Sequence, residues 1–458
     1  MELKMQRLLG VVTASVLVTL NGAGVRTSYA ATVYEAPLDV AALLTAANGA
    51  PPMICALAAQ SVRGWGWGDY TDAPSTPLSA AVASVRSRDY NDSKLPQEDV
   101  DRLLGGLASP DACVRELSVR LLGGQRSESV ASAFVSRLGS ADASMRELAA
   151  YGLGMVRPAT GIDALIGALR DASAGVRANS AWALGRIDNG KALAPLTGLF
   201  GDRDAKVREA AVVAAGHIDS STTVPALLRV LQNDESPAVR RVAAWALGQR
   251  HAREASEVMA TQLSKEGDAR VREMIAWALG DNGGRTGSAA LIAALAHDTD
   301  ENVRETAAWA LGEMNDRTAA DALADALEGD RSDKVRATAA WAIGQMRNVP
   351  GKAPAALARL LKSDTDDTRL KAAWSLGQVG DATTLDAIRN ALKVEKSSNV
   401  RRALIRAMIK SGGRSEEALT EMLNSTDATV REAAVRGLVG NNAFNPWPWP
   451  WPRPRPFP

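Results

Sequence analysis

The sequence has few of the residues from which catalytic and metal sites are usually built. Among its 458 residues are only two cysteines and three histidines, and aromatic residues make up 4%. Two cysteines form neither a disulfide framework nor a four-cysteine zinc site. The chain also contains no H-E-x-x-H, no G-x-S-x-G and no phosphate-binding loop sequence. We therefore predict that the protein is not an enzyme and that it holds no metal and no cofactor.

An excess of charge of one sign is absent as well. The 53 basic and 52 acidic residues give a formal net charge of +1. A broad nucleic-acid surface needs clustered excess Lys and Arg, so the balance argues against a nucleic-acid partner. After Ala30 the sequence has no apolar run long enough to span a bilayer, which argues against a membrane-spanning helix in that part.

The segment 1–30 has the pattern of a secretory signal. Lys4 and Arg7 give a basic start, and Leu8–Leu20 is an apolar run that is shorter than a membrane span requires. Small residues, Ser28 and Ala30, stand where a signal peptidase reads the chain. We predict cleavage after about Ala30 and export to the periplasm or the outside. An uncleaved anchor or a buried first helix is the alternative interpretation.

Export bears on the two cysteines, because disulfides form and persist in oxidising compartments. Cys55 and Cys113 can pair there, or they can remain as two buried thiols. The sequence contains nothing that measures the distance between them, so both alternatives stay open at this stage.

A short stretch recurs along most of the chain, with the template V-R-x-x-A-A-W-A-L-G. It is seen at Val303–Gly312 and again at Val335–Gly344. Its arginine recurs at nearly constant intervals, at Arg115, Arg146, Arg177, Arg208, Arg240, Arg272, Arg304, Arg336, Arg369, Arg401 and Arg431. Such a nearly fixed period predicts stacked supersecondary units, which form a solenoid.

One repeat, residues 282–312, shows the expected unit. A turn at 282–284 precedes a first helix (helix A) over 288–296, and 298–300 connects it to a second helix (helix B) from about Glu301 to Gly312, a C-cap residue. A residue suited to the N-cap stands three positions before each template valine, at Asp111, Asp142, Ser173, Asp204, Ser236, Asp268, Asp300, Ser332, Thr365, Ser397 and Asp427. These positions predict eleven helix pairs.

The repeated arginine has a structural explanation. In seven repeats an acid stands six positions before it, at Asp171, Asp202, Asp234, Glu266, Asp298, Asp330 and Glu395. A carboxylate on the turn and a guanidinium in helix B can hydrogen-bond within one repeat or between neighbours. We predict a ladder of such pairs that holds the stack in register, in preference to a basic binding surface.

The template, the period and the Asp/Arg spacing resemble HEAT repeats, and most closely the short HEAT-like units of phycobilisome lyases and related bacterial proteins. The resemblance covers about Leu95–Gly440 and implies an all-α fold, an ARM/HEAT-like superhelix whose B helices line the concave surface. Some HEAT-like proteins are hydroxylases with His-Glu pairs as iron ligands, but no histidine here is followed by Glu. A lyase-like role in chromophore handling is a remote alternative by the same resemblance.

The template tryptophan is the candidate functional residue. With the template valine numbered as position 0, positions 0, 4, 5 and 8 of helix B fall on one side and predict the core, and the tryptophan at position 6 falls roughly opposite. The predicted partner-binding residues of the concave face are Tyr151, Trp182, Trp245, Trp277, Trp309, Trp341, Trp374, Arg406 and Arg436. These side chains either form an exposed aromatic groove or pack between repeats, and the sequence leaves both open.

The segments outside the array differ in composition. Residues 31–63 predict a helical N-terminal cap without the template, and 64–94 a Gly/Trp/Pro/Ser-rich loop that wraps the cap or binds a partner. Residues 441–458 form a Pro/Trp/Arg-rich tail, interpreted first as a disordered end. Its part 446–458 can also contact a membrane or envelope surface, or dock as proline-rich ligands do. One hypothesis places the tail in the tryptophan groove of its own or a neighbouring molecule.

Together these features predict an exported, non-enzymatic scaffold that binds a protein or peptide partner along a Trp-lined concave face. The alternative is a surface- or envelope-associated protein anchored by the Trp/Pro tail. The sequence identifies neither the partner nor the oligomeric state.

Overall fold

The structure is a computed structural model, and it describes residues 39–51, Cys55, 94–218, 220–346, 349–363, 365–411 and scattered positions between 420 and 435. The predicted signal peptide, most of the loop 64–94 and the tail 441–458 lie outside the described residues. The chain divides into two compact units, Met1–Leu199 and Phe200–Pro458, and each is described by itself.

The prediction of an all-α solenoid is confirmed, since the described residues contain helices and turns but no strand. In the first unit a short helix α2 (Val40–Ala47) precedes the helix pairs. The A helices there are α4 (Gln97–Gly106), α6 (Glu128–Arg137), α8 (Ile162–Ala168) and α10 (Leu193–Gly198). The B helices are α5 (Ala112–Gly123), α7 (Ala143–Val156) and α9 (Ala174–Ile187).

The second unit continues the same alternation. Its B helices are α11 (Ala205–His217), α13 (Pro237–Gln249), α15 (Ala269–Asp281), α17 (Glu301–Glu313), α19 (Asp333–Gln345), α21 (Asp366–Val379) and α23 (Ser398–Lys410). Its A helices are α12 (Val224–Asn233), α14 (Ser256–Lys265), α16 (Ser288–His297), α18 (Ala320–Gly329), α20 (Ala353–Leu360) and α22 (Leu385–Val394). Short 3-10 turns connect elements of both units, at Ala159–Gly161, Gly190–Ala192, Leu199–Gly201, Ser221–Thr223, Arg253–Ala255, Arg317–Ala319 and Ala382–Thr384.

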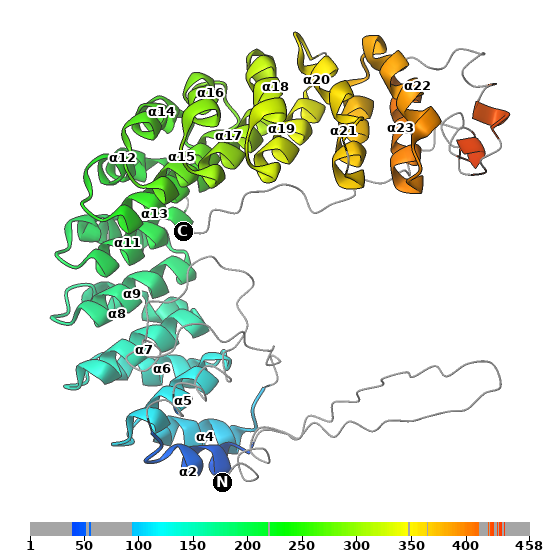
Figure 1. Cartoon of the computed structure of the whole chain (residues 1–458). Helices are drawn as coiled ribbons and strands as arrows, with labels where there is room; N and C mark the ends of the chain where they lie inside the picture. The colour runs from blue at the N-terminus through cyan, green and yellow to red at the C-terminus, as the bar shows by residue number, and fades with distance from the viewer. Residues whose placement is uncertain are drawn as a thin grey trace, which may run out of the picture. The chain divides into compact units, whose positions relative to one another are not determined.

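Within each unit the helices lie in two layers, with A helices in one and B helices in the other (Figure 1). Consecutive B helices of a unit pack side by side, and each A helix packs on the B helix that follows it in the pairs α12/α13, α16/α17 and α18/α19. The core between the layers consists of the template alanines and the apolar positions 0 and 8, such as Val303 and Leu311, which are fully buried. The eleventh predicted pair falls where only scattered residues are described.

The predicted N-caps occupy the cap positions of all ten B helices that the structure describes. Aspartates make the expected bonds, as where Asp268 Oδ1 accepts the backbone N–H groups of Arg270 and Val271 at 2.9 and 3.1 Å. The expectation is wrong for the serines Ser173, Ser236, Ser332 and Ser397, whose side chains make no cap hydrogen bond. Their own backbone N–H groups donate to the acid two positions earlier, as those of the capping residues Asp204, Asp268 and Asp300 also do.

The predicted C-cap role of Gly312 is also wrong. Helix α17 continues through Glu313, and Met314 is its C-cap residue. Gly312 lies inside the helix, where a Cβ atom would come within 2.8 Å of the Cα of Ala342 in the next B helix. The glycine is therefore required because two backbones approach closely there.

The first unit settles the alternatives for the two cysteines. Cys55 and Cys113 form a disulfide that joins the segment after α2 to the first turn of α5. The backbone N–H of Gly49 also donates to Asp111, the N-cap of α5, at 2.8 Å. Closing a loop between residues 58 positions apart restricts the unfolded chain and is worth about 4 kcal/mol in the chain-entropy account. The α2 segment is thus tied to the first B helix.

Candidate functional site

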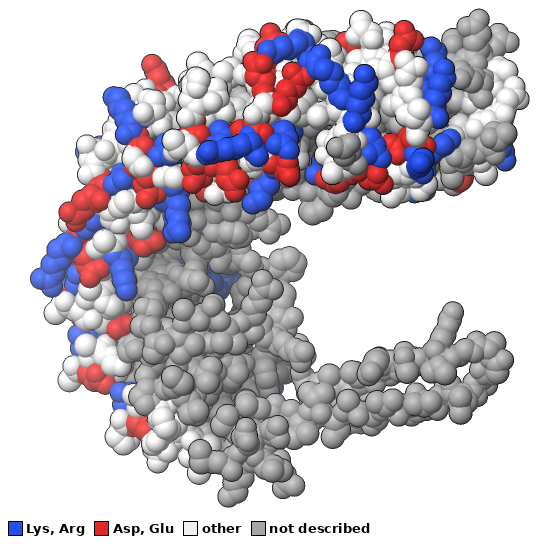
Figure 2. All heavy atoms as spheres, viewed as in Figure 1, with Lys and Arg blue, Asp and Glu red and all other residues white. Residues whose placement is uncertain are grey.

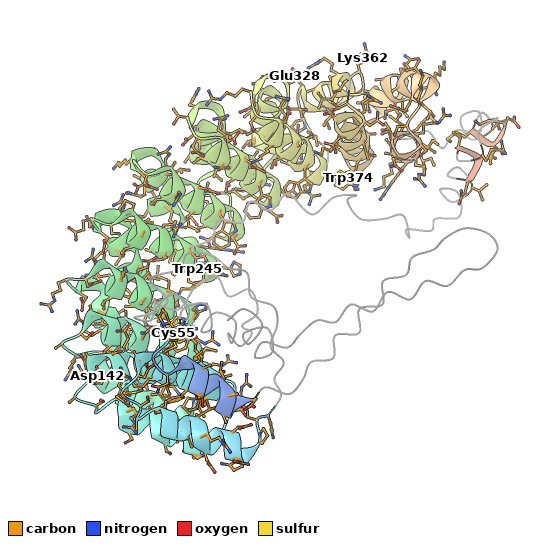
Figure 3. The ribbon with its side chains drawn as sticks, turned by 60° about the horizontal axis from the view of Figure 1, so that its bottom comes forward. Cys55, Asp142, Trp245, Glu328, Lys362 and Trp374 are labelled. Atoms are coloured by element: carbon orange, nitrogen blue, oxygen red, sulfur yellow. A yellow bond between two sulfur atoms is a disulfide. The ribbon has the colours of Figure 1, made fainter. Side chains whose placement is uncertain are left out.

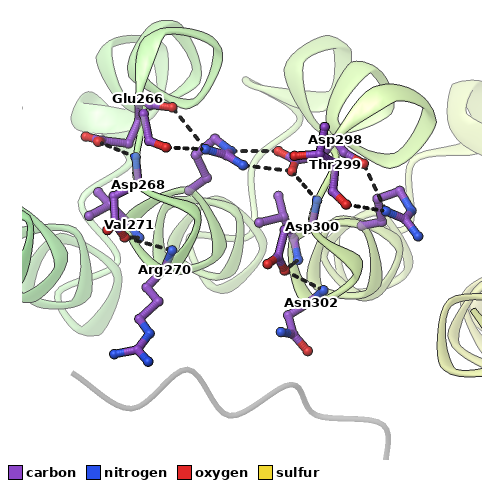
Figure 4. A network of polar contacts seen from close by, with 12 residues as sticks. Glu266, Asp268, Arg270, Val271, Asp298, Thr299, Asp300 and Asn302 are labelled. Atoms are coloured by element: carbon purple, nitrogen blue, oxygen red, sulfur yellow. Dashed lines mark hydrogen bonds and ion pairs between the residues drawn. The ribbon is translucent and has the colours of Figure 1, made fainter.

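The repeated arginines form the predicted ladder, and its carboxylate bonds run between repeats. Arg272 Nε and Nη2 donate to the carboxylate of Asp298 in the next repeat at 2.7 and 2.9 Å, while Nη1 donates to the carbonyl of Glu266 on its own turn (Figure 4). The same bidentate contact, from Nε and Nη2 to the two carboxylate oxygens, recurs in the pairs Arg146–Asp171, Arg208–Asp234, Arg240–Glu266, Arg304–Asp330 and Arg369–Glu395. In these repeats the arginine at position 1 of helix B therefore links neighbouring repeats and stabilises the stack.

The ladder changes how its acids titrate. The hydrogen bonds from Arg146 lower the pKa of Asp171, burial opposes the change, and the N–H of Ser173 adds to the lowering. The pKa of Glu395 is lowered in the same way by Arg369. These acids bind fewer protons in the folded state than in the unfolded state. They stabilise the fold above their ordinary pKa values and lose that contribution as the pH falls further.

The template tryptophans pack between repeats. Of the two alternatives that the sequence left open, the exposed aromatic groove is therefore wrong. Tyr151, Trp182, Trp245, Trp309 and Trp341 keep 0–6% of their surface exposed, and Trp277 and Trp374 are half-buried. The reason is the glycine at position 9, which leaves room for the next repeat's indole. A Cβ on Gly248 would lie 2.6 Å from Cζ3 of Trp277, and one on Gly312 would lie 2.9 Å from Cζ3 of Trp341.

The other predicted partner-binding residues belong to the last repeats. Arg406 is half-buried on α23, and Arg436 lies outside the described residues. Trp374 lies on the B-helix side, whereas Glu328 and Lys362 lie on the opposite, A-helix side (Figure 3). A role of these residues in binding a partner stays a prediction, and the buried indoles offer little surface to one.

The side of the B helices that carries positions 2, 6 and 10, named here the B-helix face, has charged residues outside the ladder. On α15 and α17 these are Glu273 and Glu305 at position 2, with Asp281 and Glu313 at position 10. Burial raises the pKa of both Glu273 and Glu305. Within the described part of the chain, neither of these two half-buried glutamates forms an ion pair within 4 Å.

The sign of the charge reverses at the last described B helix. Positions 2, 6 and 10 of α23 are Arg402, Arg406 and Lys410, which follow one another at helical spacing on one side of the helix. Burial lowers the pKa of Arg406, and burial together with the charge of Arg406 lowers the pKa of Lys410. On the side of the molecule that Figure 2 shows, Lys and Arg are interspersed with Asp and Glu.

In the first unit the B-helix face carries a continuous stack of cations and rings. The Arg120 guanidinium carbon lies 5.3 Å from the centre of the Tyr151 ring, which stacks on Trp182 at 5.4 Å with an interplanar angle of 5°. Arg186 lies 5.1 Å from the Trp182 ring and donates to the carbonyl of Gly154. Such contacts favour a fixed order of the three B helices.

Two acids accompany this stack. Glu116 is fully buried and accepts from Arg120 Nη2 at 2.7 Å. Burial and the nearby charge of Glu116 raise the pKa of Glu147 to about 7. Sequence reasoning missed these acids and their counterparts in the second unit. The signal was present, since Glu stands at position 2 in Glu116, Glu147, Glu209, Glu273, Glu305 and Glu432.

The described residues contain no group of three or more His, Cys, Asp or Glu side chains arranged to hold a metal ion. No helix in the described ranges is long and apolar enough to cross a membrane.

Comparisons with known proteins agree with the repeat architecture. A family model described as HEAT repeats matches five overlapping segments, residues 100–177, 162–236, 224–291, 288–369 and 353–439. Comparison with the sequences of curated proteins finds no match.

Three solved structures illustrate the likeness. Importin beta is 13% identical, with 89% of this chain and 67% of that chain covered and a TM-score of 0.54. An engineered protein is 21% identical, covering 76% of this chain and 98% of its own at a TM-score of 0.43. The complex of CpcE and CpcF of phycocyanin lyase from Nostoc sp. PCC7120 is 25% identical, covering 50% and 92% at a TM-score of 0.33.

Proposed function

Since the chain belongs to the HEAT repeat family, we propose that it is an exported, non-enzymatic scaffold that binds a protein or peptide along its B-helix face. The fold itself is compatible with a protein-binding scaffold, because a solenoid presents a long surface built from equivalent positions.

One observation carries the choice of face. The stack uses position 1 for the arginine ladder and positions 6 and 9 for the contact between tryptophan and glycine. Positions 2 and 10 carry charges of one sign on neighbouring repeats, with Glu273 and Asp281 on α15 and Glu305 and Glu313 on α17, and Asp281 also lies 3.4 Å from His251 Nδ1. Glu273 and Glu305 are half-buried, and carboxylates held partly out of water cost free energy unless a cation approaches them. A partner with Lys or Arg in an extended segment would supply such cations.

Export is supported by the disulfide between Cys55 and Cys113. Disulfides of this structural kind persist in oxidising compartments and are rare where thiols are kept reduced. Together with the signal-like segment 1–30, the bond favours a periplasmic or extracellular location. Mass spectrometry of the exported fraction tests this part, since a mature chain that begins near Ala31 is expected and retention of Met1 in the cytoplasm contradicts it.

The partner is tested by capture and crosslinking. Full-length protein is incubated with the exported fraction and treated with a carbodiimide, which joins carboxylates to lysines without a spacer. Crosslinks from the partner are expected on Glu273, Asp281, Glu305 and Glu313. Glu254 and Glu257 are exposed on the A-helix side of the same unit and serve as controls. A partner linked only through these two controls would contradict the proposed face.

A further inference from the structure

The acidic part of the B-helix face has an unmet polar donor beside it. Trp309 lies on α17 one turn after Glu305 and is 4% exposed. Its indole Nε1–H has no acceptor among the residues that the structure describes. A buried donor without an acceptor is uncommon in a folded protein and costs free energy. The half-buried glutamates fit a ligand that brings cations.

The end of the chain has that composition. After Glu432 the sequence contains no Asp or Glu, and its last residues alternate proline with tryptophan and arginine, ending in Arg453-Pro454-Arg455-Pro456 followed by Phe457 and Pro458. Proline has no backbone N–H, so such a segment offers carbonyl acceptors that no neighbouring N–H uses up, and it prefers an extended form. The arginines supply cations of fixed charge.

The length of the segment allows the contact. Val435 is the last residue that the structure describes, and Arg453 follows it in the sequence. Counted from Gly440, where the predicted repeats end, the stretch to Arg455 spans about 46 Å at about 3.1 Å per residue in an extended polyproline form. Neighbouring B helices lie about 10 Å apart, so α17 and α15 are roughly 40 to 50 Å from the eleventh repeat. The segment therefore reaches Glu305 and Glu273, but only if it runs nearly straight along the B-helix face.

The charges along that path favour a position of the segment's arginines beside α17 and α15. The segment first crosses α23, whose face bears Arg402, Arg406 and Lys410, and like charges keep Arg453 and Arg455 away from it. Opposite charge follows at Glu305 and Glu273 on α17 and α15. The proline and tryptophan part would lie over α21, where the half-buried Trp374 offers an apolar surface.

We propose that residues 441–458 occupy the B-helix face of their own chain from α21 to α15, with Arg453 and Arg455 beside Glu305 and Glu273. This extends the proposed function and rests on it, because a partner that uses the same carboxylates must displace the segment. The segment would then act as a built-in competitor, and binding of a partner would be weaker in the full chain than in one with a neutral segment.

The test places a crosslinkable amine in the segment of the full-length protein. The variant Arg455→Lys, purified without any partner, is treated with a carbodiimide and the linked peptides are identified by mass spectrometry. Links from position 455 are expected to Glu273, Asp281, Glu305 or Glu313, and the additional change Glu273→Gln/Glu305→Gln should reduce them severalfold. Links to Glu254 and Glu257 alone, or an even spread over surface carboxylates, would overturn the proposal.

A mixture of isotope-labelled and unlabelled chains separates the two sources of the segment. Links within chains of one isotope are expected, whereas mixed links would show that a second copy supplies the segment and would refute occupation in cis. The result is independent of the capture experiment, because no partner is present. If these links are absent but a partner still crosslinks to the B-helix face, only the position of the segment is refuted. If the links are present but no partner crosslinks to that face, only the proposed function is refuted. Melting of each variant by circular dichroism confirms that it is folded.

Discussion

The indole of Trp341 lies against Gly312 of the preceding B helix, and a Cβ atom on Gly312 would come within 2.9 Å of its Cζ3 and 2.8 Å of the Cα of Ala342. Gly312→Ala would therefore separate two packed helices. We expect a loss of about 1–3 kcal/mol in the free energy of unfolding, despite the better helix propensity of alanine. Urea unfolding measures it. In the control, Gly329→Ala, no atom lies within 4 Å of the added methyl group, and stability should stay equal or rise.

The arginine ladder predicts a contrast between neighbouring arginines of one helix. Arg272→Ala removes the pair with Asp298, whose side chain is 8% exposed, and leaves a carboxylate partly buried without a cation. A loss of about 2–4 kcal/mol is expected for a pair of this burial. Arg270 is exposed on the same helix, and Arg270→Ala should change thermal and urea unfolding by less than about 0.5 kcal/mol. Equal losses in the two variants would argue against the ladder.

Glu147 predicts a pH dependence of stability. Its folded pKa of about 7 exceeds the ordinary value of 4.5, so the folded state binds more protons in this interval. The contribution to stability is fully present below about pH 4.5 and is lost as the pH rises through 7. Glu147→Gln cannot ionise and should be more stable than the wild type at pH 8 by about 1–2 kcal/mol, after discounting for partial exposure.

The difference should vanish near pH 4.5, which unfolding curves at a series of pH values would show. Glu128→Gln changes an exposed acid of the neighbouring helix α6 and is the control. A Glu147→Gln effect that is the same at pH 4.5 and pH 8 would contradict the account.

The ladder has a gap that can be filled. Ser363 stands where other repeats have the acid, since its carbonyl accepts from Arg369 Nη1 at 2.8 Å as those acids' carbonyls do. Arg336 accordingly pairs with Asp333 of its own helix. Ser363→Asp should give Arg336 a partner in the next repeat and add about 1 kcal/mol of stability. Ser363→Asn has a similar shape without the charge, and it should gain less. Differential scanning calorimetry at two salt concentrations would compare them.

The stacking of helix pairs could be predicted from the sequence, because period, caps and core positions are properties of single repeats. The sequence left the direction of the ladder open, since Asp298 could bond the arginine of its own repeat or that of the preceding one. The position of the tryptophans could not be decided from one helix. Trp341 is buried because Gly312, a residue of another repeat, leaves room for it, and periodicity within helix B contains no information about that contact.

The missing side-chain bonds of the serine caps have no such explanation. The N–H of Ser236 donates to Asp234, but the N–H of Asp268 donates in the same way to Glu266, and Asp268 still caps its helix. The glutamates at position 2 were missed for a different reason. Their spacing was visible, but their significance depends on how far packing removes them from water.

The central claim is that the charges at positions 2 and 10 of the B-helix face bind the partner, while tryptophan and glycine serve the stack. Its most direct test is the affinity of the captured and purified partner for three full-length proteins, measured by isothermal titration. The account predicts that Glu273→Lys/Glu305→Lys weakens binding at least about tenfold with unchanged melting. Glu254→Lys/Glu257→Lys, with the same change in net charge, should leave the affinity within about twofold of the wild type. Equal affinities of the two double variants would contradict it.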